Sequence, residues 1–226
     1  MNRKIITTGD GSTTIYIEDW DEQYHSIHGA IQEANHVFIK HGLHEVLKAN
    51  LDSINILEIG FGTGLNTFIT CIEAEKRQRL IHYFGIEGYP IIKEELEQLN
   101  YDALLSDNNA AYFNAIHETS WEAQHQIHSN FTLTKHQQLF SEIVDTDCFN
   151  LIYFDAFGAK VQPELWTEDI FKIMFNALKV NGILVTYSAK GSVRRAMQAV
   201  GFTVERLGGP PGKREMLRAR KTMRSK

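Results

Sequence analysis

The sequence predicts an α/β fold in which helices cover both faces of a mainly parallel, seven-stranded sheet. Two observations predict it. Short apolar runs rich in β-branched residues alternate with longer amphipathic segments, and the first of these runs ends directly in a glycine-rich loop. Strands of a parallel sheet are buried on both faces, so they read as continuous apolar runs. Their alternation with helices is the pattern of a doubly wound sheet.

The expected elements follow the chain from residue 54 onward. Strands are expected at residues 54–59, 81–87, 131–134, 149–154, 183–187, 202–207 and 215–217. Helices are expected at residues 65–75, 91–99, 163–178 and 193–200, with prolines at the start of the second and third and Ser192 as the N-cap of the fourth. The polar segment 101–129 is expected to be helical only in patches such as 110–117.

The organisation of the chain is expected to be simple. Its 226 residues are expected to form one domain, 1–226, with an N-terminal extension (1–51), the α/β core (52–218) and a basic tail (219–226). The extension carries two turns of amphipathic helix near residues 30–39, and we expect it to cover the active face of the sheet.

Composition excludes several classes of protein. Hydrophobic residues make up 43% and charged residues 23% of the chain, which is an ordinary globular balance. No stretch approaches the roughly 18 apolar residues of a membrane span, and the first ten residues lack a signal-peptide core, so a cytoplasmic protein is expected. Cys71 and Cys148 form no CxxC pair, and the histidines form no HExxH motif. We therefore expect neither a disulfide framework nor a metal site.

The net charge of −5 conceals a strong asymmetry. Residues 187–226 carry 11 Lys/Arg against two Glu, a local charge of +9, whereas the preceding residues carry −14. A basic end on an acidic body is typical of a surface that binds polyanions. The candidate contacts within predicted structure are Arg194, Arg195, Lys213 and Arg214. A solvated tail is the alternative interpretation of residues 220–226.

Three features stand at the carboxyl ends of predicted strands, where open parallel sheets bind their ligands. Gly60, Gly62 and Gly64 follow the first strand, and glycines there permit sharp backbone angles and close approach of a ligand. Glu87 closes the second strand, where a carboxylate can accept hydrogen bonds from both hydroxyls of a ribose. Asp155 closes the fourth strand.

The spacing of the glycines narrows the choice of ligand. Dehydrogenases use GxGxxG, and a turn without a ligand is a further alternative, but this loop reads GxGxG with Glu58 two residues before it. That pattern resembles the first motif of Rossmann-like, class I S-adenosyl-L-methionine-dependent methyltransferases. The resemblance implies S-adenosyl-L-methionine as cofactor. It implies cofactor contacts at Glu58, Gly60, Phe61, Gly62, Thr63, Gly64, Asn66, Glu87 and Gly88.

A second motif narrows the family. Residues 155–160, Asp-Ala-Phe-Gly-Ala-Lys, followed by Pro-Glu-Leu-Trp at 163–166, resemble the DxFxPxxNPxxW motif of bacterial tRNA 5-(aminomethyl)uridine methyltransferases, the N-terminal domain of MnmC. Blocks at 21–38, 60–66, 193–202 and 212–217 agree in order, so the resemblance spans about residues 16–218. Two positions depart from it: Ala159 replaces a proline, and Lys135-His136-Gln137 replaces the acidic residue near adenine.

The resemblance implies conversion of 5-aminomethyl(-2-thio)uridine to 5-methylaminomethyl(-2-thio)uridine at the wobble position of tRNA. Asp155 would orient the amine and take its proton, although capping its own loop is the simpler role. Phe157 is favoured over Tyr24 and Trp166 as the surface that stacks on the base. The four basic residues would contact the RNA backbone of the anticodon loop. We expect a monomer, without the flavin-dependent half of the fused proteins.

Two other functions remain open at this point. An aminopropyltransferase of the spermidine synthase type shares the fold and an amine nucleophile, although a basic surface would repel its polyamine substrate. A non-catalytic RNA-binding scaffold is the other alternative. The intact glycine loop, Glu87 and Asp155 argue against such a loss of catalysis.

Overall fold

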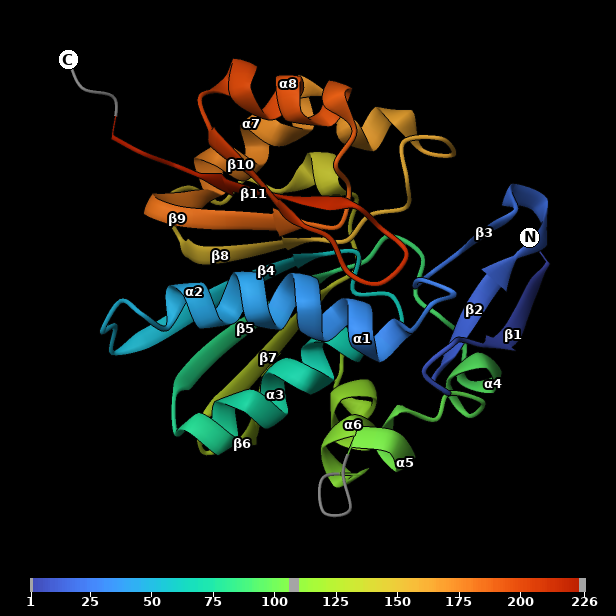
Figure 1. Ribbon diagram of the computed structural model, residues 1–226. Helices are drawn as coiled ribbons and strands as arrows, with labels where there is room; N and C mark the ends of the chain where they lie inside the picture. The colour runs from blue at the N-terminus through green and yellow to red at the C-terminus, as the bar shows by residue number, and fades with distance from the viewer. Residues whose placement is uncertain (1, 106–109, 224–226) are drawn as a thin grey trace.

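The computed structural model describes residues 2–105 and 110–223. Its centre is an eight-stranded sheet with the order β10-β11-β9-β8-β4-β5-β7-β6 (Figure 1). The strands are β4 (Ser53–Ile59), β5 (Leu80–Ile86), β6 (Gln124–His128), β7 (Phe131–His136), β8 (Phe149–Phe154), β9 (Leu178–Thr186), β10 (Thr203–Gly208) and β11 (Glu215–Arg220). Pairs among β7, β5, β4, β8 and β9 are parallel, and the three remaining pairs are antiparallel.

All seven predicted strands are present, but the prediction of a seven-stranded sheet is wrong by one strand. The additional strand, β6, pairs with β7 in antiparallel register at the sheet edge. Its sequence, Gln-His-Gln-Ile-His, contains a single aliphatic residue, and its side chains are partly or fully exposed. A strand that buries so little apolar surface carries no apolar run, and the segment therefore read as irregular.

The helices differ from their predicted bounds mainly at the ends. They are α3 (Leu65–Arg77), α4 (Lys93–Leu96), α5 (Tyr101–Leu105), α6 (Ala110–Glu118), α7 (Glu168–Ala177) and α8 (Gly191–Val200). The helix expected at 91–99 is thus a single turn. The helix expected at 163–178 is a 3-10 turn, Pro163–Trp166, followed by α7, whose N-cap hydroxyl on Thr167 accepts from the Ile170 N–H at 3.5 Å. The N-cap of α8 is Lys190, not Ser192.

The N-terminal segment has two parts. A small antiparallel sheet consists of β1 (Arg3–Thr7), β2 (Thr13–Ile17) and β3 (Glu22–Gln23), none of which the sequence predicted. A continuous helical stretch follows, from α1 (Ala30–Ala34) through a π-helical segment (Asn35–Leu43) to α2 (His44–Val46). Figure 1 shows this helix lying along the central sheet.

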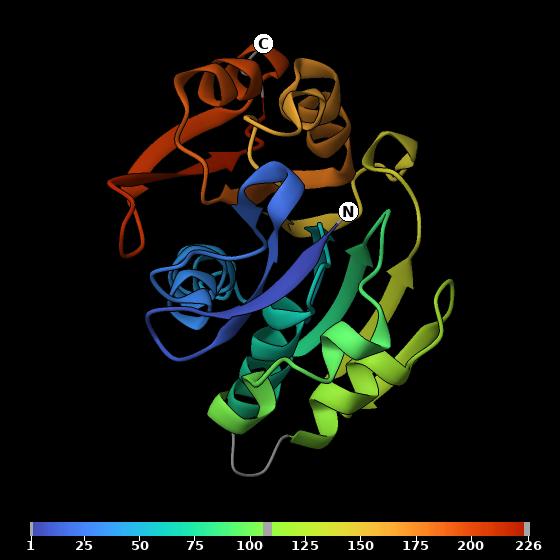
Figure 2. The same cartoon turned by 90° about the vertical axis from the view of Figure 1, so that its right-hand side faces the viewer.

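The long N-terminal helix belongs to the core rather than to a cover. The Phe38 and Tyr153 rings lie 5.1 Å apart, and a Cβ atom on Gly42 would lie 3.0 Å from Val185 of β9. The helix packs against the same face as α3 and α6, whereas α7 and α8 pack against the opposite face. Residues 17–28 reach the sheet ends, and in Figure 2 the blue N-terminal strands cross in front of them.

Part of the basic C-terminal region is structural. Arg218 and Arg220 lie in β11 and pair with Glu45 on α2, at 3.3 and 3.4 Å. Lys221 pairs with Asp147 at 2.7 Å. These charges join the last strand to the rest of the fold, which lowers the number of cations available to a polyanion. Residues 224–226 lie outside the described part of the chain.

Candidate functional site

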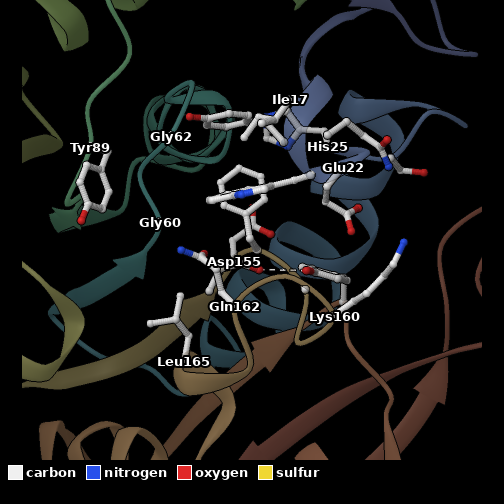
Figure 3. A pocket seen from close by; sticks show the side chains of 18 of the residues that line it. Ile17, Glu22, His25, Gly60, Gly62, Tyr89, Asp155, Lys160, Gln162 and Leu165 are labelled. Carbon is white, nitrogen blue, oxygen red and sulfur yellow. Dashed lines mark hydrogen bonds between the residues drawn. The ribbon is translucent and has the colours of Figure 1, made fainter. Parts of the chain in front are cut away.

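A cavity of about 1240 Å³ opens at the carboxyl ends of β4, β5 and β8, as expected for an open parallel sheet. Figure 3 shows Asp155 between two groups of lining residues: Gly60, Gly62 and Tyr89 lie on one side, and Glu22, His25 and Lys160 lie on the other. We call the first side the cofactor end. We call the second side the acceptor end; it also holds the lining residues Glu33, which accepts from the Ser26 N–H next to His25, and Lys213, which pairs with Glu33.

The glycine loop needs its glycines for steric reasons. Gly60 has φ +86°, and a Cβ atom there would lie 2.7 Å from the carbonyl oxygen of Asp155. Gly62 has φ +51°, and a Cβ atom there would lie 3.2 Å from the Tyr24 ring. Both glycines line the cavity, so the main chain itself forms its wall. This bare wall fits a bound cofactor, since any side chain at Gly62 would occupy space in the cavity.

Glu87 is held with its carboxylate at the cofactor end. Its Oε2 accepts the Gly62 N–H at 3.0 Å, and its Oε1 accepts the Tyr89 N–H at 2.9 Å. Each carboxylate oxygen has a further lone pair, and Glu87 and Gly88 both line the cavity. The arrangement suits the vicinal hydroxyls of a ribose.

Several predicted cofactor contacts lie behind the loop. Glu58 is fully buried and does not line the cavity; its carboxylate accepts from Asn66 Nδ2 at 3.0 Å and from Thr67 Oγ1 at 2.8 Å. Burial raises the pKa of Glu58 to about 8. Phe61, Thr63, Gly64 and Asn66 are also absent from the lining of this cavity. The structure therefore places these residues as supports of the loop.

Two of these supports connect the loop to the rest of the site. Asn66 Nδ2 also donates to Asp155 Oδ2 at 2.8 Å, so a single amide joins Glu58 to Asp155. Thr63 Oγ1 and His25 Nε2 are 2.7 Å apart, which ties the N-terminal segment to the glycine loop. Burial lowers the pKa of His25 to about 4, so its ring is neutral near pH 7.

Asp155 has the electrostatics of a proton acceptor that works near neutral pH. Burial, and secondarily the negative charge of Glu33, raise its pKa to about 7, whereas the Asn66 hydrogen bond and Lys213 act in the opposite direction. A general base is most effective when its pKa lies near the working pH. Such a perturbed carboxyl in a cavity is a candidate for a functional role.

The aromatic candidates separate into lining and supporting residues. Phe157 and Tyr24 line the cavity with ring centroids 4.9 Å apart, and Trp20, which the sequence did not indicate, lies 5.3 Å from Phe157. Trp166 is 5% exposed and donates Nε1–H to the Phe157 carbonyl at 2.7 Å. It therefore holds the Phe157 loop in place and offers no face for stacking.

The basic candidates divide into one residue that lines the cavity and three that do not. Lys213 lines the cavity, but its ammonium is paired with the Glu33 carboxylate. Arg194, Arg195 and Arg214 do not line it. Lys160 and Lys190 do; both are exposed, and no ion pair to a described residue involves them. Sequence reasoning assigned neither lysine a role in the site, nor Glu22, His25 and Glu33, although Lys160 lies in the motif at 155–160 and the other three in the block at 21–38.

The segment that lacks the expected acidic residue faces away from the main cavity. Lys135 is 2% exposed and donates to the carbonyls of Ile116 and His117, at 2.9 and 3.2 Å. It lines a second cavity of about 640 Å³ next to α6. The residues that line the cofactor end after β7 are Leu139, Phe140 and Ser141.

Two features are absent from residues 2–105 and 110–223. No helix among these residues is long and apolar enough to cross a membrane. No group of three or more His, Cys, Asp or Glu side chains among them is arranged to hold a metal ion.

Comparisons with known proteins bear on the family and the fold. A family model described as S-adenosyl-L-methionine-dependent methyltransferase matches residues 101–222. The "tRNA 5-methylaminomethyl-2-thiouridine biosynthesis bifunctional protein MnmC" of Cupriavidus metallidurans is 31% identical over 95% of this chain and 33% of its own length. The protein of that name from Actinobacillus pleuropneumoniae serotype 5b is 29% identical, and the match covers 96% of this chain and 35% of that protein's length. The chain thus spans about a third of these relatives.

Solved structures share the fold. MNMC2 from Aquifex aeolicus has a TM-score of 0.81 and 24% identity, covering 98% of this chain and 70% of the other. Spermidine synthase from Thermotoga maritima has a TM-score of 0.53 and 11% identity, covering 97% and 72%. At these identities the likeness concerns the fold, which is the Rossmann-like class I architecture that the sequence predicted.

Proposed function

Because the chain belongs to the family of S-adenosyl-L-methionine-dependent methyltransferases, we propose that its acceptor is the primary amine of 5-aminomethyl(-2-thio)uridine at the wobble position of tRNA. The product would be 5-methylaminomethyl(-2-thio)uridine. Its cofactor is S-adenosyl-L-methionine. Relatives named for the biosynthesis of 5-methylaminomethyl-2-thiouridine support this acceptor, because nearly the whole of this chain matches about a third of their length. The observation that carries the proposal is Asp155, placed between the two ends of one cavity.

The chain's own residues suit the two ends to different partners. Gly60, Gly62, Glu87 and Gly88 would hold the cofactor at the cofactor end. When bound, S-adenosyl-L-methionine supplies a methyl group that a neutral nitrogen can attack. Catalysis of such a transfer consists mainly of positioning the nucleophile in line and at short distance. Phe157 would stack on the base and thereby fix the direction of its aminomethyl group.

The substrate amine must lose a proton before it can attack the methyl group, and Asp155 is the proposed acceptor of that proton. A primary amine is largely an ammonium ion near pH 7, and an ammonium nitrogen has no lone pair with which to attack. The Asp155 carboxylate can accept an N–H hydrogen bond from the ammonium and then its proton, leaving a neutral amine beside a neutral carboxyl. With a pKa of about 7, Asp155 can accept this proton and later release it to solvent.

The proposal is tested by the identity of the methylated nucleoside. The protein is incubated with methyl-labelled S-adenosyl-L-methionine and tRNA that lacks the final methyl group, and the tRNA is digested to nucleosides. We expect the label in 5-methylaminomethyl(-2-thio)uridine. Label in any other nucleoside, or in none, would contradict the proposed acceptor, and complete absence of turnover would favour a scaffold.

The aminopropyltransferase alternative is tested in a parallel assay. It is suggested by the fold shared with spermidine synthase. Incubation with decarboxylated S-adenosyl-L-methionine and putrescine should yield no spermidine, because the exposed ammonium groups of Lys160 and Lys190, which line the cavity, repel a polyamine cation. Spermidine formation would overturn the tRNA proposal.

The same two lysines are proposed to bind phosphates of the RNA backbone. Replacing both, Lys160→Gln with Lys190→Gln, should weaken tRNA binding and lower the slope of log K against log salt by about one for each phosphate that is no longer neutralised. Binding is measured between low and moderate salt. The matched control replaces two exposed lysines outside the cavity, Lys40→Gln with Lys172→Gln, and should leave the slope unchanged. If the salt dependence of tRNA binding had the same slope in both double variants, Lys160 and Lys190 would not belong to the tRNA interface. Arg195 and Arg214, both exposed, remain proposed partners of more distant phosphates.

A further inference from the structure

One ion pair in the cavity, between buried Glu33 and half-buried Lys213, has no role in the steps described so far. Glu33 of α1 is 7% exposed; its Oε2 accepts the Ser26 N–H at 2.9 Å, and its Oε1 accepts from the Lys213 ammonium. Both side chains line the acceptor end. A buried carboxylate is costly unless it is paired, so Lys213 is required where Glu33 is present.

Lys213 is held by more than its ion pair. Its Nζ lies 3.9 Å from the centroid of the Tyr187 ring, within the range of a cation–π contact. The Tyr187 hydroxyl in turn donates to the carbonyl of Ala156, the residue after Asp155, at 2.9 Å. Lys213 is thereby fixed beside the strand end that carries Asp155, and its ammonium is not free to follow a phosphate.

The loop that carries Lys213 is anchored to the N-terminal segment at two further points. His36 Nε2 lies 2.8 Å from the carbonyl oxygen of Gly208. A Cβ atom on Gly212, which has φ +82°, would collide with the His28 ring, so the two chain segments are in direct contact there. The β10–β11 loop and the start of α1 thus meet over the acceptor end, although they lie about 180 residues apart in the sequence.

On the premise that the proposed function is correct, we propose that Glu33 and Lys213 form a positioning pair. The pair joins α1 to the β10–β11 loop around the acceptor end, and its two opposite charges set the field that the substrate amine meets beside Asp155. Lys213 is then an internal counter-ion and not a contact to the RNA backbone.

The two charges of the pair act on Asp155 in opposite directions. Glu33 raises the pKa of Asp155 and Lys213 lowers it. The other groups that face Asp155 are Asn66 of α3, which donates to it, Tyr187 after β9, and Glu58 of β4, whose own pKa Asp155 raises. Glu22 acts on Tyr187 from the N-terminal segment. Neutralising Glu33 or Lys213 leaves the hydrogen bond from Asn66 to Asp155 in place, and both charges act on Asp155 directly.

The sign of each effect does not depend on which group holds the proton. Removing a negative charge lowers the pKa of any nearby acid, whether it is the Asp155 carboxyl or the substrate ammonium, and removing a positive charge raises it. The amine and Asp155 titrate as one coupled system, so the acid limb of the pH profile of kcat reports on the pair. The charge of Glu33 or Lys213 therefore moves that limb in a predictable direction.

The experiment is a double-mutant cycle read as a pH profile. We measure kcat against pH for the full chain with saturating cofactor and tRNA, in Glu33→Gln, Lys213→Met and the combined variant. Glu33→Gln leaves Lys213 unopposed and should move the acid limb down by about one pH unit. Lys213→Met leaves Glu33 unopposed and should move it up by about as much. The combined variant should return towards the wild-type limb.

Two controls separate this effect from a loss of structure. Lys213→Arg keeps the charge and should keep the wild-type limb. Arg206→Met and Glu215→Gln neutralise a pair of 3.5 Å on the same hairpin but outside the cavity, and should also leave the limb in place. A folding defect would lower kcat at every pH and would not move the limb in opposite directions.

Two results would overturn the proposal. One is equal loss of rate in both single variants with no displacement of the acid limb. The other is an unmoved limb in Lys213→Met together with a lower salt slope of tRNA binding, which would return Lys213 to the RNA interface. Failure of the proposed function is a separate result, because wild-type protein would then place no label in 5-methylaminomethyl(-2-thio)uridine.

Discussion

Replacing Asp155 by alanine is expected to lower kcat for methyl transfer by about 10²- to 10⁴-fold, the usual contribution of a general base. The cofactor affinity should be nearly unchanged, because the Asp155 carboxylate accepts from Asn66 behind the loop, and the Asp155 atom next to Gly60 is its main-chain carbonyl oxygen. The rate is measured with labelled cofactor and the affinity by calorimetry. A large loss of affinity would instead assign Asp155 to cofactor binding.

The pH dependence of the same residue gives a second readout. The wild-type rate should fall as the pH drops below about 7, since the carboxyl becomes protonated there and can no longer accept a proton from the amine. Asp155→Asn keeps the shape of the side chain but should stay inactive at every pH. Asp145→Asn, an exposed acid outside the cavity, is the matched control and should retain both the rate and the profile.

Stability distinguishes lost chemistry from lost structure in these variants. The pKa of Asp155 is raised in the folded state from an ordinary value of 3.8 to about 7, so the folded protein binds more protons than the unfolded chain in that interval. The wild type therefore loses stability as the pH rises from about 4 to 7. Asp155→Asn lacks this loss, and its Tm above pH 7 should be at least that of the wild type. A lower Tm would indicate a structural role.

The central sheet could be predicted because its strands are buried on both faces and so contain unbroken apolar runs. Of the elements that escaped prediction, β3 and β6 lack such runs, whereas β2, Thr-Thr-Ile-Tyr-Ile, contains a short one that was not predicted to be a strand. The edge strand β6 is polar, and β1 to β3 are short and depend on tertiary contacts, such as the 2.8 Å hydrogen bond from the Thr13 N–H to Asn100 Oδ1. A bond between residues 87 positions apart has no local signal. Local patterns therefore predicted the core of the fold and missed its periphery.

The site divides in the same way. Gly60, Glu87 and Asp155 could be predicted to converge, since each directly follows a parallel strand and these strand ends meet at one edge. The burial of the Glu58 side chain could not be predicted, because a strand buried on both faces shows no alternation of polar and apolar residues from which the direction of a side chain could be inferred. Its motif position indicated cofactor binding, but the structure shows a buried support of Asn66 and Thr67.

The acceptor end was the part least accessible from sequence. Glu33 did leave a signal, as a lone acidic residue among the buried helix positions Ala30, Ala34 and Val37. A carboxylate on an apolar face needs a partner, but nothing in the sequence identifies Lys213 as that partner 180 positions away. The basic charge of the C-terminal region is evident in the sequence, yet charge alone could not tell Lys213, which is paired internally, from Lys160 and Lys190 at the rim.

The second large effect is expected at the glycine loop. Gly62→Ala should weaken S-adenosyl-L-methionine binding by at least about tenfold, or about 1.4 kcal/mol. The added methyl group would lie 3.2 Å from the Tyr24 ring, on the wall where the main chain lines the cofactor end. Affinity is measured by calorimetry on the purified variant, with its Tm recorded in parallel.

A matched control separates occupied space from backbone strain. Gly62 has φ +51°, and Gly11 has φ +85° with nothing within 4 Å of its added Cβ, so alanine strains the main chain at both positions. Both variants should lose about 1–2 kcal/mol of stability for that reason, whereas only Gly62→Ala should lose cofactor affinity, because Gly11 lies outside the cavity lining. If both variants bound the cofactor equally well, the space next to Tyr24 would not belong to the cofactor. The cofactor end would then have to be sought along Gly60 and Glu87 alone.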